Sequence, residues 1–151
     1  MSIPIDTITA AIAGLTVTGV TIRDTSQLTD HIEHRDMPLL APRPNQFVNL
    51  HPVERDTYGL ASVARKTVTF ELIYRFFHSD AGEGRGLFDM FPDFLDKIFA
   101  IEDALIAADA LGGTVDMQLI GTPEFGIVLD GANNQCWGAD VTIQCVLYVN
   151  N

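Results

Sequence analysis

The chain lacks the features of a disulfide-stabilised, secreted or membrane-spanning protein. It has only two cysteines, Cys136 and Cys145, in 151 residues, which is too few for a disulfide framework. In a regular strand they would face opposite sides of a sheet, although a bulge at Gly138 would change that parity. We therefore expect buried, reduced thiols in an intracellular protein. No apolar run approaches the roughly 18–20 residues of a membrane span, and residues 1–6 contain no Lys or Arg to begin a secretion signal.

Positive charge is scarce, and it is unevenly distributed. The formal net charge is −11. Residues 1–79 contain eight acidic and seven basic residues, a net of −1, whereas residues 80–151 contain twelve acidic and two basic residues, a net of −10. The acidic half is either a solvated surface that keeps the protein soluble or an anionic face that repels nucleic acid. Both interpretations disfavour a specific DNA-binding domain, because Lys and Arg are needed to bind phosphates.

Catalytic motifs are missing as well. No serine lies in a G-x-S-x-G turn, and the glycines of residues 82–86 lack the spacing of a nucleotide-binding loop. On a helix, His31 and His34 would lie one turn apart, but zinc takes three or four ligands and no further Cys or His has a suitable spacing. We predict that the protein is not an enzyme and binds no cofactor and no metal. The alternative is a small metal- or ligand-binding, hydrolase-like domain that uses the His31/His34 region.

Two long alternating segments lie on either side of an acidic, amphipathic one. Residues 67–78 place apolar side chains on one face, with Ile73 and Phe77 as exceptions on the other, and residues 140–149 alternate in the same way. Such patterns are typical of antiparallel strands covered on one face. Residues 87–111 have apolar side chains at helical spacing. We expect a helix there that covers the strands and begins near Phe91, so that Pro92 lies in its first turn.

The remaining elements are shorter. We expect a helix over residues 3–14, strands over 16–23 and 47–50, a loop over 51–66, and a hairpin of two strands over 114–121 and 125–130. Residues 37–44 contain three prolines and should form an edge strand or a loop, because proline lacks the N–H that a central strand requires. These elements predict one α+β domain over residues 1–151. Its sheet is mainly antiparallel, some parallel pairing is allowed, and both helices pack on it.

Five of the nine basic residues lie between positions 35 and 66: Arg35, Arg43, Arg55, Arg65 and Lys66. They are either ordinary loop charges or a surface that pairs with the acidic half of another copy. An apolar interface through Ile73, Phe77 and the proline-rich segment is the other arrangement that we consider. The five basic residues, together with Ile73 and Phe77, are the candidate interface.

The chain resembles the tail terminator, or tail-completion, proteins of long-tailed bacteriophages. The segment R-D-M-P-L-L at residues 35–40 is similar to an edge motif of that family, D-L-P-x-L. A long strand then leads through a glycine-rich loop to an acidic helix. The segment L-G-G-T-V at 111–115 resembles the family's exit from that helix, and G-A-D-V-T-I at 138–143 resembles its final strand. The P-R-P stretch at 42–44 departs from the family's smoother strand.

The resemblance implies a structural virion protein without active-site residues. Such proteins form rings, typically hexamers, that cap the head-proximal end of the tail tube, stop its polymerisation and join it to the head–tail connector. The implied partners are copies of the chain itself, the tail tube protein and the connector, with genomic DNA passing through without specific binding and no membrane involved. The implied location is the head–tail interface of the virion, after assembly in the host cytoplasm. Another neck or head–tail connector protein is the alternative within this class.

Overall fold

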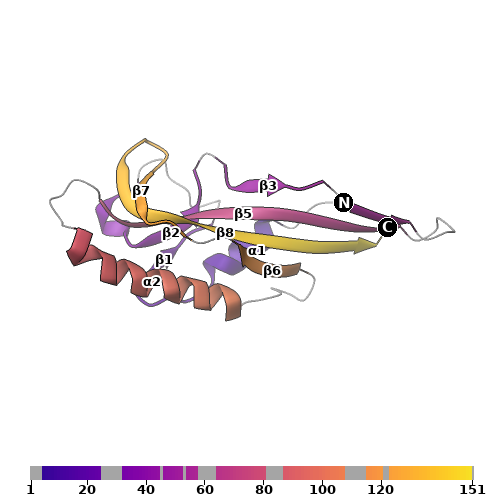
Figure 1. The fold of residues 1–151 in the computed structure, drawn as a ribbon, viewed down its shortest axis with the longest axis horizontal. Coiled ribbons are helices and arrows are strands. Elements are labelled where there is room, and N and C mark those ends of the chain that lie inside the picture. The colour runs from indigo at the N-terminus through magenta and orange to yellow at the C-terminus, as the bar shows by residue number, and fades with distance from the viewer. Residues whose placement is uncertain are drawn as a thin grey trace.

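The computed structural model describes residues 5–24, 32–44, 46–52, 54–57, 64–80, 87–107, 115–120 and 123–150. Its centre is a pair of long antiparallel strands, β5 (Ala64–Asp80) and β8 (Gln135–Asn150). They run side by side along the length of the molecule (Figure 1). β5 has 17 residues, so it extends for about 55 Å at the usual rise of a strand. Both long strands predicted from the sequence are present, and both are longer than expected.

Shorter strands complete the sheet on both sides of this pair. They are β1 (Thr21–Ile22), β2 (Leu39–Pro42), β3 (Val48–Leu50), β4 (Glu54–Thr57), β6 (Val115–Ile120) and β7 (Gly126–Leu129). β2, β3 and β4 follow one another along β5, whereas β6 and β7 follow one another along β8. β1 pairs with β2 in parallel, and the other pairings between these strands are antiparallel. The predicted α+β fold with a mainly antiparallel sheet is therefore confirmed.

Two helices, α1 (Ile5–Ala13) and α2 (Leu87–Ala107), pack on one face of the sheet. Alternate residues of β5 face them and are at most 1% exposed: Val68, Phe70, Leu72, Tyr74 and Phe76. Their partners in the same apolar cluster include Ile12 of α1 and Phe94, Ile98 and Ile101 of α2. The helical spacing of apolar residues in each helix therefore corresponds to the stripe that is buried. Figure 1 shows α2 lying along the sheet.

The opposite face of the sheet is covered at one end. Phe77 is 1% exposed and belongs to a second apolar cluster with Ile32, Leu39 and Cys136. The carboxylate of Asp130, in the turn between β7 and β8, accepts a hydrogen bond from the Ile32 backbone N–H at 3.0 Å. The sequence pattern predicted burial on one face only. Phe77 is apolar on the opposite face because this end of the sheet has a small core of its own.

The prolines of residues 37–44 led us to expect an edge strand or a loop, but β2 does not lie at the edge of the sheet. It lies between β1 and β5. The backbone N–H of Thr21 donates to the Pro38 carbonyl at 3.0 Å, and that of Arg23 donates to the Leu40 carbonyl at 2.9 Å. Proline retains its carbonyl acceptor. The two bonds accepted by Pro38 and Leu40 need no proline N–H, so the prolines at 38 and 42 are compatible with a strand on this side of β2.

Two predictions of connectivity are wrong. Residues 51–66 were expected to form a loop, but β4 pairs with the start of β5. Residues 114–130 were expected to form a hairpin, but β6 and β7 each pair with a different part of β8. The physical reason is the length of the two central strands. Each offers enough edge for several short strands to pair in succession, so short strands that are neighbours in sequence need not pair with each other.

Local backbone geometry corrects two further boundaries. The expected strand over residues 16–23 is interrupted by a tight turn, in which Val17 bridges Val20 and Gly19 has a φ of 78°. Such a positive φ favours glycine. α2 begins at Leu87, so Pro92 lies inside the helix instead of in its first turn. Pro92 cannot donate a hydrogen bond to the carbonyl of Phe88, and its own side chain is exposed.

The two cysteines lie on opposite sides of β8, as their spacing predicted. Cys145 belongs to the cluster beneath the helices and Cys136 to the second cluster, and both are fully buried. The register of β5 against β8 shifts between Phe77 and Ser79, so the irregularity lies in β5, opposite Gly138, and not at Gly138 itself. Burial raises the pKa of the Cys145 thiol to about 12. Buried thiols are therefore confirmed.

We expect the replacement Tyr74→Phe to stabilise the protein. Tyr74 is fully buried, and its hydroxyl has no hydrogen-bond partner among the described residues. Burial, followed by the nearby Cys145 and Asp24, raises the pKa of Tyr74 far above its usual value. Removal of a buried, unsatisfied hydroxyl should raise the free energy of unfolding by about 1 kcal/mol. Urea denaturation of both proteins tests this, and a loss of more than about 0.5 kcal/mol would show that the hydroxyl is satisfied.

Candidate functional site

Two adjacent hollows lie beside α2, near the edge of the sheet where β6 ends and β7 begins. One is a notch of about 370 Å³ with mixed polar and apolar lining, and the other is an apolar groove of about 400 Å³. Both are lined by Glu102 of α2 and by Pro123 of the segment before β7. Together they form the candidate functional site.

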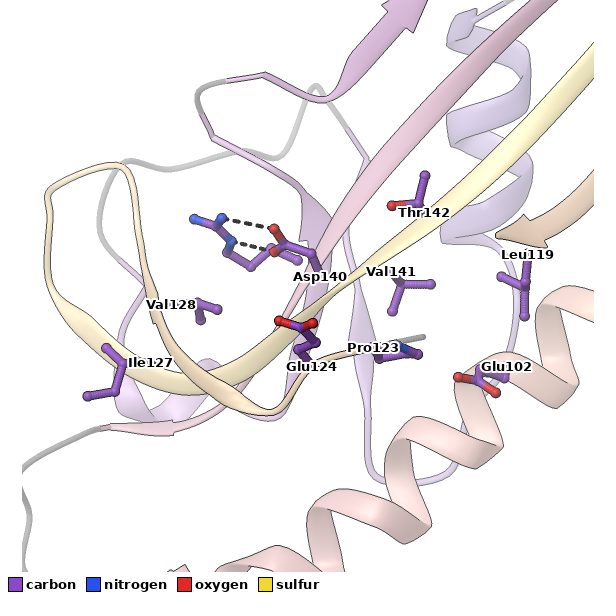
Figure 2. Close-up of a pocket in the computed structure, with 10 residues that line it drawn as sticks. Glu102, Leu119, Pro123, Glu124, Ile127, Val128, Asp140, Val141 and Thr142 are labelled. Carbon is purple, nitrogen blue, oxygen red and sulfur yellow. Dashed lines mark hydrogen bonds and ion pairs between the residues drawn. The ribbon is translucent and has the colours of Figure 1, made fainter. Parts of the chain in front are cut away.

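An ion-pair network forms one wall of the notch. The guanidinium of Arg75 makes two contacts with the Asp140 carboxylate, Nε to Oδ1 at 2.7 Å and Nη2 to Oδ2 at 3.1 Å. The same guanidinium donates to the backbone carbonyl of Leu129 at 2.9 Å, and Arg43 Nη1 lies 3.4 Å from Asp140 Oδ2. Figure 2 shows the paired contacts on Asp140. Arg75 and Asp140 are direct partners across β5 and β8, so this network joins the two central strands.

The rest of the notch is acidic and apolar. Glu102 extends from α2 and Glu124 from the segment before β7 (Figure 2). Burial, followed by the negative charge of Asp103, raises the pKa of Glu102. Because Arg75 already pairs with Asp140, the notch offers an incoming group mainly carboxylate oxygens and the exposed side chain of Ile127. It is therefore suited to contact with a basic or apolar surface and not with an anionic ligand.

Aromatic side chains build the apolar groove. Phe94 of α2 is buried, and its ring centroid lies 4.5 Å from that of Phe125. Phe125 in turn stacks on Trp137 of β8 at 5.3 Å. At the outer side of the groove, Phe91 and Phe99 are 37% and 56% exposed. The floor is thus fixed by packing, whereas the rim presents apolar surface to solvent.

The end of β5 is attached to α2 by a buried histidine. His78 Nε2 lies 2.7 Å from Asp93 Oδ2, and its Nδ1 lies 3.2 Å from Ser79 Oγ. Lys97, one turn further along α2, contacts the other oxygen of Asp93 at 3.2 Å. A chain of hydrogen bonds that links Ser, His and Asp side chains is typical of hydrolases. Ser79, however, is only 3% exposed. A substrate has no access to its hydroxyl, so we assign this group a role in packing.

The contact between His78 and Asp93 predicts a pH-dependent stability. The hydrogen bond from His78, assisted by Lys97, lowers the pKa of Asp93 below its ordinary value of 3.8. A lowered pKa in the folded state means that ionised Asp93 stabilises the fold above about pH 4, and that this contribution is lost as the pH falls through the lowered value. The replacement Asp93→Asn should therefore destabilise the protein at pH 6, by less than about 1 kcal/mol because the carboxylate is partly exposed.

Urea denaturation of wild type and Asp93→Asn at pH 6 and at pH 3 measures this effect. We expect the difference between the two proteins at pH 6 to shrink toward pH 3, as the pH approaches the lowered pKa of the wild-type carboxyl. A difference that stays constant over that range would contradict the role of the carboxylate.

The candidate interface residues are spread over the molecule. Arg35 is 80% exposed and lies 2.6 Å from Glu33, whereas Arg43 is engaged by Asp140 and by the backbone carbonyl of Gln46. Ile73 and Phe77 are 7% and 1% exposed. Burial removes these two side chains from the candidate interface, because the fold itself covers them. The pairing of basic residues with another copy stays a prediction.

Backbone register brings the other three basic residues together. Arg55 of β4 is the direct partner of Lys66 in β5, and Arg65 is the next residue along β5. Sequence spacing did not predict this, because residues 51–66 were expected to form a loop. The three basic residues therefore share one end of the long β5–β8 pair.

The metal-binding alternative is only partly covered by the structure. His31 lies outside the described residues, and His34 begins a short 3-10 helix over His34–Asp36. No group of three or more His, Cys, Asp or Glu residues is arranged to hold a metal ion in the part of the chain that the structure describes. In that same part, no helix has the length and hydrophobicity needed to cross a membrane.

Sequence analysis missed several residues of the site. The pairing of Arg75 with Asp140 depends on strand register, and the contact of His78 with Asp93 depends on helix placement. Phe99 could have been recognised, because three of its four neighbours at helical spacing, Asp96, Glu102 and Asp103, are acidic. No protein-family model matches this chain, and no curated protein matches it significantly.

Proposed function

We propose that this protein is a tail terminator of a long-tailed bacteriophage, a ring that caps the head-proximal end of the tail tube and joins it to the head–tail connector. The observation that supports the proposal most is the order of elements. The chain has, in order, a short helix, a proline-flanked strand, a long strand, an acidic helix and a final long strand. This is the order on which the resemblance to tail terminator proteins rests. Of the segments that resemble family motifs, residues 138–143 lie in β8 and residues 35–40 end in the first two residues of β2, whereas the segment at 111–115 lies outside the described residues except for Val115.

The chemistry of the site agrees with a structural role. Arg75 in the notch already pairs with Asp140, and a substrate cannot reach the buried hydroxyl of Ser79. The groove exposes aromatic side chains at its rim. Exposed apolar surface beside a folded core is typical of contact with another protein. The function that these features favour is assembly and not catalysis.

The net charge fits a passage for DNA. Six copies at −11 each would total about −66. A ring whose lumen shares that sign would let DNA slide without binding, because phosphates are retained by Lys and Arg. The proposal therefore gives the shortage of basic residues a function.

Polymerisation of purified tail tube subunits tests the proposal. Addition of the protein at a low ratio to subunits should stop elongation and give shorter tubes, with lengths that decrease as its concentration rises. The control is the same amount of heat-unfolded protein, which should leave tube length unchanged. If the native protein leaves the length distribution unchanged and instead binds only empty capsids with their portal, the alternative of a connector protein replaces the proposal.

A further inference from the structure

The notch and the groove share a wall, so one occupant can fill both. Glu102 of α2 and Pro123 line the two hollows, which have volumes of about 370 and 400 Å³. At their outer sides, Phe99 of the groove and Ile127 of the notch are both more than half exposed. Small-molecule sites enclose most of their ligand, whereas these hollows are open at the rim. An occupant that also covers the rim is therefore favoured over a free small molecule.

The side chains of the notch that remain available to an occupant are negative. Its lining contains three carboxylates, of Glu102, Glu124 and Asp140, and one guanidinium, of Arg75, a formal net charge of −2. Arg75 already contacts Asp140 twice. Among the described residues, no basic side chain contacts Glu102 or Glu124, which extend from two different elements (Figure 2). The group that complements this lining is a hydrogen-bond donor with a positive charge, as in lysine and arginine.

The groove complements a large apolar side chain. Phe94 at its floor is buried, and its ring packs against that of Phe125 at 4.5 Å. Phe91 and Phe99 present apolar surface at the rim. A preformed apolar pocket with aromatic walls is a typical site for the anchor residue of a protein contact.

Glu102 lies where the two hollows meet. Burial, followed by the negative charge of Asp103, raises the pKa of this carboxyl. A positive charge in the notch would oppose both effects, because it favours the ionised carboxylate. Since the same side chain also lines the groove, a cation that reaches it lies next to whatever fills the groove. The apolar and the positive group of the occupant are therefore neighbours.

We propose that the notch and the groove together bind an extended segment of another protein, in which a large apolar side chain lies next to a lysine or an arginine. The apolar side chain enters the groove, and the ammonium or guanidinium group enters the notch and contacts Glu102 and Glu124. The rest of the partner covers the rim and excludes water, which strengthens the ion pairs. The inference does not rest on the proposed function, because it concerns the chemistry of the segment and not the assembly in which it occurs.

Short peptides with blocked ends test this chemistry on the whole protein. The probe is Gly-Phe-Lys-Gly, and two control peptides replace its lysine by glutamine or its phenylalanine by glycine. Calorimetry gives the dissociation constants. Trp137 fluorescence reports filling of the groove, because Phe125 lines the groove and stacks on this indole. We expect the probe to bind with a dissociation constant of about 1 mM or below, and each control peptide to bind at least about fivefold more weakly.

Two pairs of protein variants locate the bound peptide. Glu102→Gln removes the charge where the hollows meet, and Asp96→Asn is its control, because Asp96 is exposed on the same helix but lines neither hollow. Phe99→Ala shortens the rim of the groove, and Ile106→Ala is its control, because Ile106 is 62% exposed and lines neither hollow. Circular dichroism establishes that each variant is folded.

The pairs should differ in which part of the peptide they affect. Glu102→Gln should bind the lysine and glutamine peptides within about twofold of each other, while it still prefers phenylalanine to glycine. Phe99→Ala should weaken the probe by about fivefold or more and still prefer lysine to glutamine. The two control variants should bind all three peptides like wild type. A merely structural role of Glu102 would weaken all three peptides alike.

Several results would overturn the inference. They are no saturable binding of the probe by wild type, equal affinity of wild type for the lysine and glutamine peptides, or unchanged binding by both site variants. Free phenethylamine that binds as tightly as the probe would assign the site to a small molecule. A dissociation constant that rises with protein concentration would show that a second copy fills the site. Tube growth is measured separately, so the peptide site and the proposed function can each fail while the other stands.

Discussion

The replacement Gly138→Ala should unfold or severely destabilise the protein. A Cβ atom at this position would lie 1.8 Å from the backbone carbonyl oxygen of Phe76 and 3.1 Å from a methyl group of Val128. The carbonyl belongs to β5, in the longest strand pairing of the molecule and next to the register shift between Phe77 and Ser79. Because a backbone atom cannot rotate away like a side chain, β5 and β8 would have to separate. We expect a loss of at least about 3 kcal/mol in the free energy of unfolding, a large part of a typical total of 5–15 kcal/mol.

Gly126→Ala is the matched control for this replacement. Gly126 is the direct strand partner of Gly138, and nothing lies within 4 Å of a Cβ built on it. Its replacement should change the free energy of unfolding by less than about 1 kcal/mol and could be slightly stabilising, because alanine restricts the unfolded chain. Thermal and urea denaturation of the two variants give the comparison. Equal stability of Gly138→Ala and Gly126→Ala would show that the two strands are not in the register described.

The replacement Phe94→Ala should cost roughly 3–5 kcal/mol. Phe94 is 2% exposed, and its ring lies 5.7 Å from that of Phe76 and 4.5 Å from that of Phe125. Phe94 thus packs against both the sheet and the segment before β7. Loss of the ring would leave a cavity between the helix and the sheet, and would also remove the floor of the groove.

Phe99→Ala is the control on the same helix. Phe99 is 56% exposed, so its truncation should change the free energy of unfolding by no more than about 0.5 kcal/mol. Urea denaturation monitored by Trp137 fluorescence is suitable for both variants, because Phe125 stacks on that indole. A loss below about 1 kcal/mol for Phe94→Ala would place α2 away from the sheet and contradict the fold.

The sequence predicted the parts of the fold that depend on local periodicity. Residues of β5 alternate in burial as their hydrophobic pattern indicated, and the apolar stripe of α2 is the face that packs on them. The parity of Cys136 and Cys145 was also predicted correctly, because β8 is regular between them. These features need only the period of a strand or a helix.

Features that depend on pairing between distant segments were not predictable in this way. β6 and β7 each satisfy local strand preferences, but their common partner is β8 and not each other. Phe77 looked like an exposed apolar residue because the pattern of β5 contains no information about the residues that cover it, such as Ile32 and Val128. The buried contact of His78 with Asp93 arises where the end of β5 meets α2, and no short-range pattern records it.

The candidate site was predictable only in its charge. The acidic character of residues 80–151 and the five basic residues between positions 35 and 66 are evident from the sequence, whereas the apolar groove needs the placement of α2 against Phe125. The proximity of Arg55, Arg65 and Lys66 likewise depends on the register that sets Arg55 opposite Lys66. Composition therefore indicated which kinds of surface exist, and the fold determines where they lie.

The location of the protein on assembled tail tubes tests the central claim most directly. Gold-labelled protein would be added to purified tubes that have both ends free and imaged by electron microscopy. The account predicts one label cluster at one end of each tube, visible as a ring, and no further growth at that end when subunits are added. Labels along the tube walls, labels at neither end, or labelled ends that continue to grow would contradict the account.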